Sequence, residues 1–353
     1  MCGWAWSCKH PSQTVSLGQA WHTTQRAGQR QRSRCEKMGR RLPWAFITKI
    51  YYILNKKELP PSIDANAALR WQALPLAESP WLHEEVAQRM AQRLEWITLQ
   101  PQQWLHWQPS KGGVQAHGVL RQRYPQAQAW VYEPHGAQQA LLQRLEAQAQ
   151  AGWLQRTLSK WRAPSTFVGL PEAGTVDMLW ANMALHTSAD PQALLAQWRE
   201  VLAPNGFVMF SALGPDTLQE LRALYQQLGW PAPCHAFTDM HDWGDMLVQA
   251  GFAEPVMDME RITLTFATPE RLLQELRGLG RNLSNARGTV TRGQHWQQQL
   301  LEGLRGMAQD GVIPLTFEVI YGHALQAPKR HQVAGTTEIS LQDMQSMLRK
   351  EQP

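Results

Sequence analysis

The feature that most constrains this chain is an alternation of short apolar runs with amphipathic helical stretches, which extends from residue 103 to residue 211. Each apolar run has the length of a strand, and the stretches between runs carry apolar residues with the period of a helix. Strands that alternate with helices form a parallel sheet with right-handed crossovers. The sequence therefore predicts an α/β fold with a doubly wound, mostly parallel sheet, whose ligand binds beyond the carboxyl ends of the strands.

The same periodicity places the individual elements. Strands are predicted at 103–107, 129–132, 166–169, 176–180, 207–211, 262–266 and 315–321. Helices are predicted at 81–94, 114–123, 138–149, 191–202, 216–228, 240–250, 269–279 and 295–308, the last two forming an insert between the last two strands. Asp190 is the expected N-cap of one helix, because Pro191 follows it at the first helical position. Pro204-Asn205-Gly206 predicts a turn.

The positive charge of the chain is concentrated at its beginning. Residues 1–58 contain 11 Lys+Arg and two Glu, which leaves 23 Lys+Arg and 27 Asp+Glu in the remainder. A body that binds nucleic acid needs an excess of positive charge to displace counterions from phosphates, so we expect no nucleic-acid partner. Residues 1–58 are interpreted as a basic, disordered leader, with a targeting presequence or an over-long gene model as alternatives.

The double proline at residues 60–61 marks the end of this leader. The predicted organisation is a leader at 1–58, one domain at 59–326 and a polar tail at 327–353. Only Cys234 lies in the domain, and the spacing of cysteine and histidine suits no metal site, which indicates a reducing cytoplasm. No run of 18 apolar residues is present, so no membrane span is expected. Asp239 and His241 resemble a metal pair, but Asp239 is better interpreted as a helix N-cap.

Three blocks of sequence resemble the malonyl-acyl-carrier-protein O-methyltransferases of biotin biosynthesis. They lie at 176–222, 237–266 and 314–325, and include the segments GPDTL and FEVIYGH, which are specific to this branch of methyltransferases. Mitochondrial relatives, complex I assembly factors that modify an arginine, share these blocks. The resemblance covers about 265 residues. It implies a class I methyltransferase fold, with a Rossmann-like doubly wound sheet and a C-terminal helical insert.

The resemblance implies methyl transfer from S-adenosylmethionine to the free carboxyl of a malonyl thioester on acyl-carrier protein. A carboxyl with a pKa of about 4 is already ionised at neutral pH, so no general base is required. The protein must align the reacting atoms and exclude water. We expect a cytoplasmic monomer. Two alternatives stay open: a catalytically silent scaffold on the same fold, and a relative that modifies a protein side chain.

The expected cofactor loop departs from the family pattern. Class I methyltransferases carry an acid and a Gly-x-Gly-x-Gly-like turn after the first strand, where glycines allow the backbone to approach the cofactor. Here His106 replaces the acid, and Gln108 and Ser110 replace two glycines. Gly112 remains, with Gly113 beside it, and is predicted to contact the cofactor. Either S-adenosylmethionine binds through an altered loop, or catalysis has been lost.

Three further cofactor residues follow from the resemblance. Glu133 ends the second strand, where the family keeps an acid whose two oxygens accept hydrogen bonds from the ribose hydroxyls. Asn182 follows the fourth strand and would line the methyl-transfer cleft. Glu172 precedes the fourth strand and is the candidate acid that faces the adenine.

The substrate carboxylate needs a cationic partner, and a bidentate arginine suits it best. The insert between the last two strands, which caps the cleft in relatives, includes Arg277, Arg281, Arg287 and Arg292. Arg287 and Arg292, each followed by a glycine, are the predicted catalytic residues.

Overall fold

The computed structural model describes residues 63–76, 78–134, 166–288 and 292–327, together with Leu141, Gln143 and Leu145. The predicted leader, nearly all of the predicted tail and most of the predicted helix at 138–149 lie outside these residues. Within the described residues, none of the helices has the length and the apolar character that crossing a membrane requires.

A seven-stranded sheet with the order β3-β2-β1-β4-β5-β7-β6 forms the centre of the domain. Strands β1 to β5 pair in parallel, whereas β7 runs antiparallel to both β5 and β6. The strand order reverses between β1 and β4, which is where doubly wound sheets bind ligands. The predicted doubly wound, mostly parallel sheet is therefore confirmed. The strands are β1 (Gln103–Trp107), β2 (Gln128–Tyr132), β3 (Thr166–Val168), β4 (Val176–Ala181), β5 (Leu202–Leu213), β6 (Phe252–Phe266) and β7 (Ile313–Gln326).

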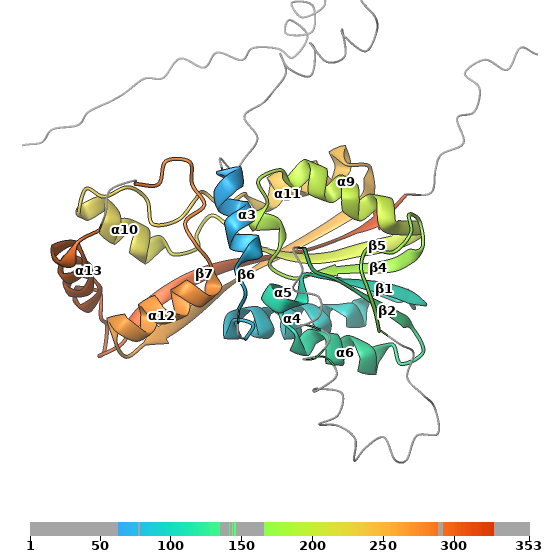
Figure 1. Ribbon diagram of the computed structural model, residues 1–353, viewed down its shortest axis with the longest axis horizontal. Helices are drawn as coiled ribbons and strands as arrows, with labels where there is room; N and C mark the ends of the chain where they lie inside the picture. Colours follow the sequence, from blue (N-terminus) through green and yellow to red (C-terminus); the bar gives the residue numbers. More distant parts are fainter. Residues whose placement is uncertain are drawn as a thin grey trace, which may run out of the picture. The chain divides into compact units, whose positions relative to one another are not determined.

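Helices cover both faces of this sheet. Helices α4 (Trp81–Arg93) and α6 (Gln115–Arg123) lie on one face, and α9 (Pro191–Val201) and α11 (Met240–Gln249) lie on the other (Figure 1). Successive strand residues point to opposite faces, so Trp104 and Leu105 are both fully buried but belong to different core clusters. This two-sided burial explains why the parallel strands are apolar runs in the sequence.

Two predicted helix starts are confirmed by their capping contacts. The Asp190 carboxylate accepts a hydrogen bond from the backbone N–H of Ala193 at 2.9 Å, and Pro191 begins α9. The Asp239 carboxylate accepts one from the backbone N–H of His241 at 2.8 Å, at the start of α11. Asp239 is therefore a helix cap, as its position in the sequence indicated.

Several predicted boundaries were wrong. Helix α10 (Gln219–Gln227) begins three residues later than predicted, because residues 214–218 form a turn that is bonded to β7. Strands β6 and β7 are longer than predicted, since they pair with each other along most of their length. The predicted turn at 204–206 lies inside β5, where Asn205 adopts a left-handed backbone and the pairing with β4 shifts register.

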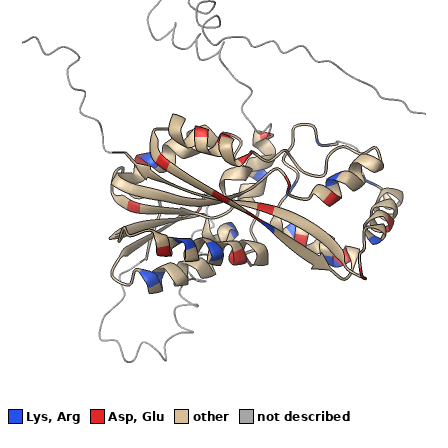
Figure 2. Cartoon of the chain, turned by 180° about the vertical axis from the view of Figure 1, so that it is seen from behind, with Lys and Arg blue, Asp and Glu red and all other residues tan. Residues whose placement is uncertain are grey.

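The insert between β6 and β7 contains α12 (Pro269–Leu279) and α13 (Gln294–Gly306). These two helices gather with α10 at the end of the long antiparallel strands, beyond the carboxyl ends of the parallel strands (Figure 1). On α4, Arg89 bonds to Glu260 of β6 at 3.0 Å and Arg93 bonds to Asp258 of β6 at 2.7 Å, and these two contacts fasten α4 to β6. Figure 2 shows how basic and acidic residues are distributed over the helices and the long strands.

Two of the segments that carry the resemblance, GPDTL at 214–218 and FEVIYGH at 317–323, contact each other. The Glu318 carboxylate on β7 accepts a hydrogen bond from the backbone N–H of Asp216 at 2.7 Å. The backbone N–H of Gly214 donates to the carbonyl of Glu318 at 2.9 Å, and a Cβ at Gly214 would lie 2.7 Å from the Glu318 carboxyl carbon. The turn after β5 thus requires both the acid and the glycine, although they are distant in sequence.

Gly322 on β7 is a second position that requires glycine. It pairs with Phe210 of β5, and a Cβ at this position would lie 2.5 Å from the Phe210 ring. We predict that Gly322→Ala lowers the free energy of unfolding by about 1–3 kcal/mol, because the fully buried ring has little room to move. Urea unfolding of the purified protein would measure this loss.

Gly278→Ala is the matched control for this substitution. Gly278 lies in α12, and a Cβ there would meet no atom within 4 Å. Alanine is favoured over glycine in a helix by about 0.5–1 kcal/mol, so this variant should be as stable as the parent or slightly more so. Equal stability of Gly322→Ala and Gly278→Ala would contradict the packing argument.

Candidate active site

The loop after β1 keeps a glycine-like conformation without the glycine. Gln108 adopts the left-handed region, with φ 50° and ψ 52°, which costs a non-glycine residue about 1–2 kcal/mol. Its backbone N–H donates to the carbonyl of Tyr132 at 2.7 Å, which ties the loop to the end of β2. The single helical turn α5 (Pro109–Gly112) follows. The altered sequence therefore does not prevent the sharp turn at the switch point of the sheet.

The predicted cofactor residue Gly112 is required for packing. A Cβ at this position would lie 2.6 Å from the backbone oxygen of Asn182, so only glycine lets the loop approach the end of β4. The neighbouring Gly113 has φ 114° and faces the Glu84 carboxylate. A contact between Gly112 and a cofactor stays a prediction, but the close approach of loop and strand is a property of the fold.

Glu133 lies against the loop. It directly follows β2, only 5% of its surface is exposed, and its carboxylate accepts a hydrogen bond from the backbone N–H of Ser110 at 2.6 Å. A carboxylate with a charge-assisted hydrogen bond of this kind is strongly fixed in position. The structure thus brings together two of the predicted cofactor elements, the acid after β2 and the loop after β1.

Asn182 connects the loop to three other elements. Its side-chain amide donates to the backbone carbonyls of His83 on α4, at 2.7 Å, and of Gly112. Its side-chain oxygen accepts from the hydroxyl of Ser211 on β5 at 2.5 Å. The side chain is buried, and both of its N–H donors are used inside the protein. Asn182 therefore holds the cleft together, and a direct contact with cofactor stays a prediction.

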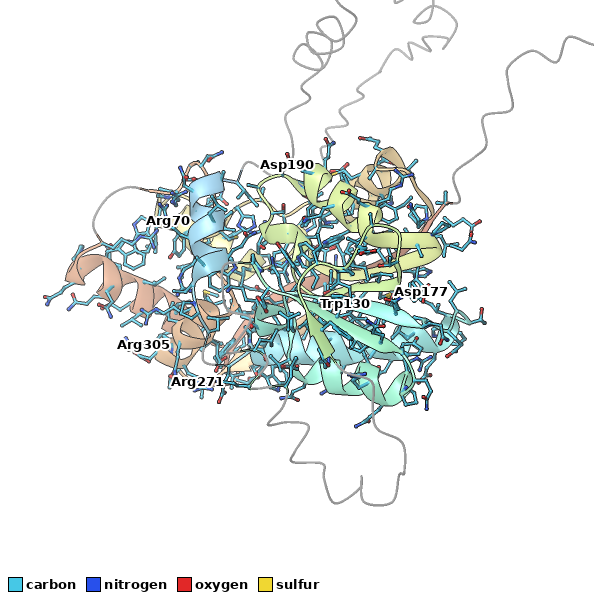
Figure 3. All side chains as sticks on the ribbon, turned by 45° about the vertical axis from the view of Figure 1, so that its right-hand side comes forward. Arg70, Trp130, Asp177, Asp190, Arg271 and Arg305 are labelled. Atoms are coloured by element: carbon cyan, nitrogen blue, oxygen red, sulfur yellow. The ribbon has the colours of Figure 1, made fainter. Side chains whose placement is uncertain are left out.

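Glu172 lies away from these residues. It is exposed in the turn between β3 and β4, and the backbone N–H of Gly174 in the same turn donates to the carbonyl of Glu200 at the end of α9. This contact ties the turn to the end of α9, just before the amino end of β4. Figure 3 shows the β4 residue Asp177 at the far end of the sheet from α3. The structure does not bring Glu172 together with Glu133, and its predicted contact with adenine stays untested.

A helix that the sequence analysis missed lies beside the loop. Helix α3 (Ala65–Ala73) ends where the Lys111 ammonium donates to the backbone carbonyls of Gln72 and Leu74, at 3.1 and 2.8 Å. The same ammonium lies 5.3 Å from the ring centre of Trp71, and burial lowers the pKa of Lys111. The loop after β1 is thus fastened to α3 through its single lysine.

The beginning of α3 is fastened to the insert. Asp64 caps the helix by accepting from the backbone N–H groups of Asn66 and Ala67, and the Arg287 guanidinium donates to the same carboxylate at 2.5 Å. A second arginine of the insert also contacts α3: the Arg281 guanidinium lies 5.4 Å from the centre of the Trp71 ring. Arg287, predicted to bind substrate, is therefore engaged with α3. The sequence signal for helix α3, an Asp before an alanine-rich segment, was present but weak.

A cavity of about 470 Å³ opens beyond the ends of β4 and β5. Arg292, the second predicted substrate residue, lines this cavity, and its guanidinium lies 4.5 Å from the Trp296 ring centre. Arg287 instead lines a separate hollow of about 300 Å³ beneath α3. The structure does not place the two arginines in one pocket. Apolar side chains dominate the larger cavity, among them Leu213, Leu221, Leu273, Leu276, Leu300 and Phe317.

Two ionisable side chains that line this cavity are uncharged. Burial raises the pKa of the Cys234 thiol to about 11, so it stays protonated at neutral pH. Burial, with the nearby imidazoles of His235 and His83, lowers the pKa of His186 well below its ordinary value. The cavity is therefore weakly polar apart from its arginines.

Buried histidines also surround the cofactor loop. The Nδ1 of His83 bonds to the backbone carbonyl of Lys111 at 2.7 Å, and burial lowers the pKa of His83 to about 4. His106, which replaces the family acid, is fully buried and stacks on His117 at 5.8 Å between ring centres. Burial lowers the pKa of His106 and brings that of His117 to about 3. These imidazoles are neutral at pH 7.

Comparison with known proteins finds methyltransferases among the relatives of this chain. A family model described as a methyltransferase domain matches residues 112–210. A "Malonyl-[acyl-carrier protein] O-methyltransferase" of Laribacter hongkongensis is 37% identical over 290 residues, which is 80% of this chain and 93% of the relative. Proteins of the same description from Gallionella capsiferriformans and Methylovorus sp. are 38% and 34% identical, and the matches cover 79% and 80% of this chain and 93% of each relative.

The neutral buried histidines predict a loss of stability in mild acid. Below the ordinary pKa of about 6.5 the unfolded chain binds protons that the folded protein does not, until the folded pKa is reached. For His83 this window runs from pH 6.5 down to about 4. Each such histidine should lower the free energy of unfolding by about 1.4 kcal/mol per pH unit within the window.

Urea unfolding at pH 7.5, 6 and 5 would measure this slope. His83→Gln should reduce the slope by the contribution of one histidine, because glutamine does not titrate. His241→Gln changes a solvent-exposed histidine and is the matched control. If the free energy of unfolding of His83→Gln falls with pH as steeply as that of the parent protein, His83 is not a source of the acid sensitivity.

Proposed function

This chain belongs to the malonyl-[acyl-carrier protein] O-methyltransferase family, and we propose that it methylates the free carboxyl of malonyl-acyl-carrier protein with S-adenosylmethionine, in biotin synthesis. The observation that carries the proposal is the buried carboxylate of Glu133, held beside the loop at the switch point of the sheet. Its place at the end of β2 is where an acid can bind the two hydroxyls of a ribose.

The residues present fit such a cofactor. Gln108 keeps the left-handed turn that glycine would otherwise provide, and Gly112 keeps the close approach of loop and strand. S-adenosylmethionine supplies a methyl group that is already activated by its sulfonium. Glu133 would hold the ribose, and the loop backbone from Gln108 to Gly112 would lie along the amino-acid part. The silent-scaffold alternative rested on the missing glycines, and the conformation of the loop weakens that argument.

The chain's own contribution is to position the carboxylate and exclude water. The cavity beyond β4 and β5 is apolar, so a carboxylate that enters it loses hydration and its attraction to a cation strengthens. Arg292 lines this cavity and is the proposed partner of the substrate carboxylate. Arg287 contributes indirectly, since it fixes α3 through Asp64. That the protein acts as a cytoplasmic monomer stays a prediction.

Binding of S-adenosylmethionine tests the role of Glu133. We expect Glu133→Gln to weaken binding by about one hundredfold, since two hydrogen bonds to a charged acceptor are each worth about 1.5–3 kcal/mol and the amide replaces only part of them. Isothermal calorimetry would measure the dissociation constants. Glu200→Gln, at an exposed glutamate at the end of α9, is the control and should bind like the parent protein. Equal affinity of both variants would exclude the ribose role.

Methyl transfer tests the proposed reaction directly. Purified protein should transfer a labelled methyl group from S-adenosylmethionine to malonyl-acyl-carrier protein and not to acetyl-acyl-carrier protein, which lacks the free carboxyl. The gene should also restore growth of a biotin auxotroph that lacks this step, whereas Glu133→Ala should not. If the parent protein binds S-adenosylmethionine yet methylates no acyl-carrier thioester, the proposed substrate is wrong. If it does not bind the cofactor, the silent scaffold is favoured.

A further inference from the structure

The larger cavity contains a polar side chain that nothing in the proposed reaction uses. His186 lies in the short helix η3 (Leu185–Thr187), which follows β4 at the switch-point side of the sheet. It lines the cavity, yet only 3% of its surface is exposed. Its Nδ1 is buried without a hydrogen-bond partner. This nitrogen is closed off from the cavity, so Nε2 is the ring nitrogen that a ligand in the cavity can reach.

A neighbouring histidine holds His186 in place. The Nε2 of His235 bonds to the backbone carbonyl of His186 at 3.0 Å, and a carbonyl only accepts, so Nε2 of His235 carries the proton. The ring of Phe237 packs against that of His186, with 5.9 Å between the ring centres. The backbone and the ring of His186 are therefore both supported by the segment that precedes α11.

Because the His186 imidazole is neutral, it can form a hydrogen bond with an uncharged atom of a ligand. A neutral imidazole has one N–H, and no contact of His186 among the described residues fixes which nitrogen carries it. With the proton on Nε2, the nitrogen that a ligand can reach, the imidazole can donate to a neutral acceptor in the cavity. The cavity also contains Arg292, a permanent cation that suits a carboxylate. A malonyl thioester carries one charged and one neutral acceptor, the carboxylate and the thioester carbonyl, two bonds apart along its carbon chain.

We propose that the His186 imidazole donates a hydrogen bond to the thioester carbonyl oxygen of the acyl substrate and thereby orients the free carboxylate for methylation. This assignment rests on the proposed function and adds to it a residue that recognises the thioester. It divides the recognition of the acyl group between a neutral donor at η3 and a cation from the insert. His186 touches the substrate, whereas His235 positions His186.

A pair of substrates that differ in one oxygen tests the assignment. The first is malonyl-pantetheine, and the second is the thioether in which a CH₂ group replaces the thioester carbonyl while the carboxylate is retained. The parent protein should prefer the thioester by about three- to tenfold in kcat/KM and in affinity, as expected for one neutral hydrogen bond. His186→Phe, which retains a ring in the cavity, should lose this preference and treat both compounds alike.

His186→Gln is the conservative variant, because its amide keeps an N–H donor, and it should regain most of the preference. Affinity is measured by calorimetry without the methyl donor, so that the result does not depend on turnover. Thermal unfolding of each variant verifies that it folds. If His186→Phe weakens both compounds equally, or if the parent shows no preference, the contact with the carbonyl is excluded while methyl transfer by the parent stands. If the parent methylates neither compound nor malonyl-acyl-carrier protein, the proposed function itself has failed.

Discussion

The hydrogen bonds of the Asn182 side chain are the constraint on which the site depends. One buried amide joins the end of β4 to α4, to the loop after β1 and to β5. Because the crevice of a doubly wound sheet lies where β1 and β4 part, its width is set by what joins these strands at their carboxyl ends. Gly112 belongs to the same arrangement, since any side chain there would push the loop away from Asn182. A methyltransferase cleft can keep its shape in this way after losing most of its loop glycines.

The fold was predictable where local sequence and tertiary packing agree. Buried parallel strands are apolar runs, and α9 begins with an Asp-Pro pair, so both were found from the sequence. Prediction failed where contacts between residues far apart in the sequence determine the local structure. Residues 216–218 were predicted as the start of a helix, but the backbone N–H of Asp216 donates to Glu318, a residue about a hundred positions later. Helix α3 is short, and its ends are held by Lys111 and Arg287, which no local pattern connects to it.

The same distinction applies to the site. Glu133 was identified through the resemblance, because it ends the second strand, where the family keeps an acid, and the structure places it against the loop. The two insert arginines could not be separated by sequence, since each precedes a glycine. Only the folded chain shows that Arg287 pairs with Asp64 and that Arg292 lines the cavity. His186 was missed because only the folded chain shows that it lines the cavity.

The distribution of charge fits a reaction that consumes charge. A carboxylate and a sulfonium become a neutral ester and a neutral thioether, so a weakly polar environment favours the products and strengthens the attraction that brings the reactants together. The cavity provides this environment, since its two histidines and its thiol are neutral and its fixed charges are arginines. Helix α3 joins the loop of the cofactor side to the insert of the substrate side through Lys111 and Arg287. The helix that local sequence patterns did not reveal is therefore the element that links the loop after β1 to the insert.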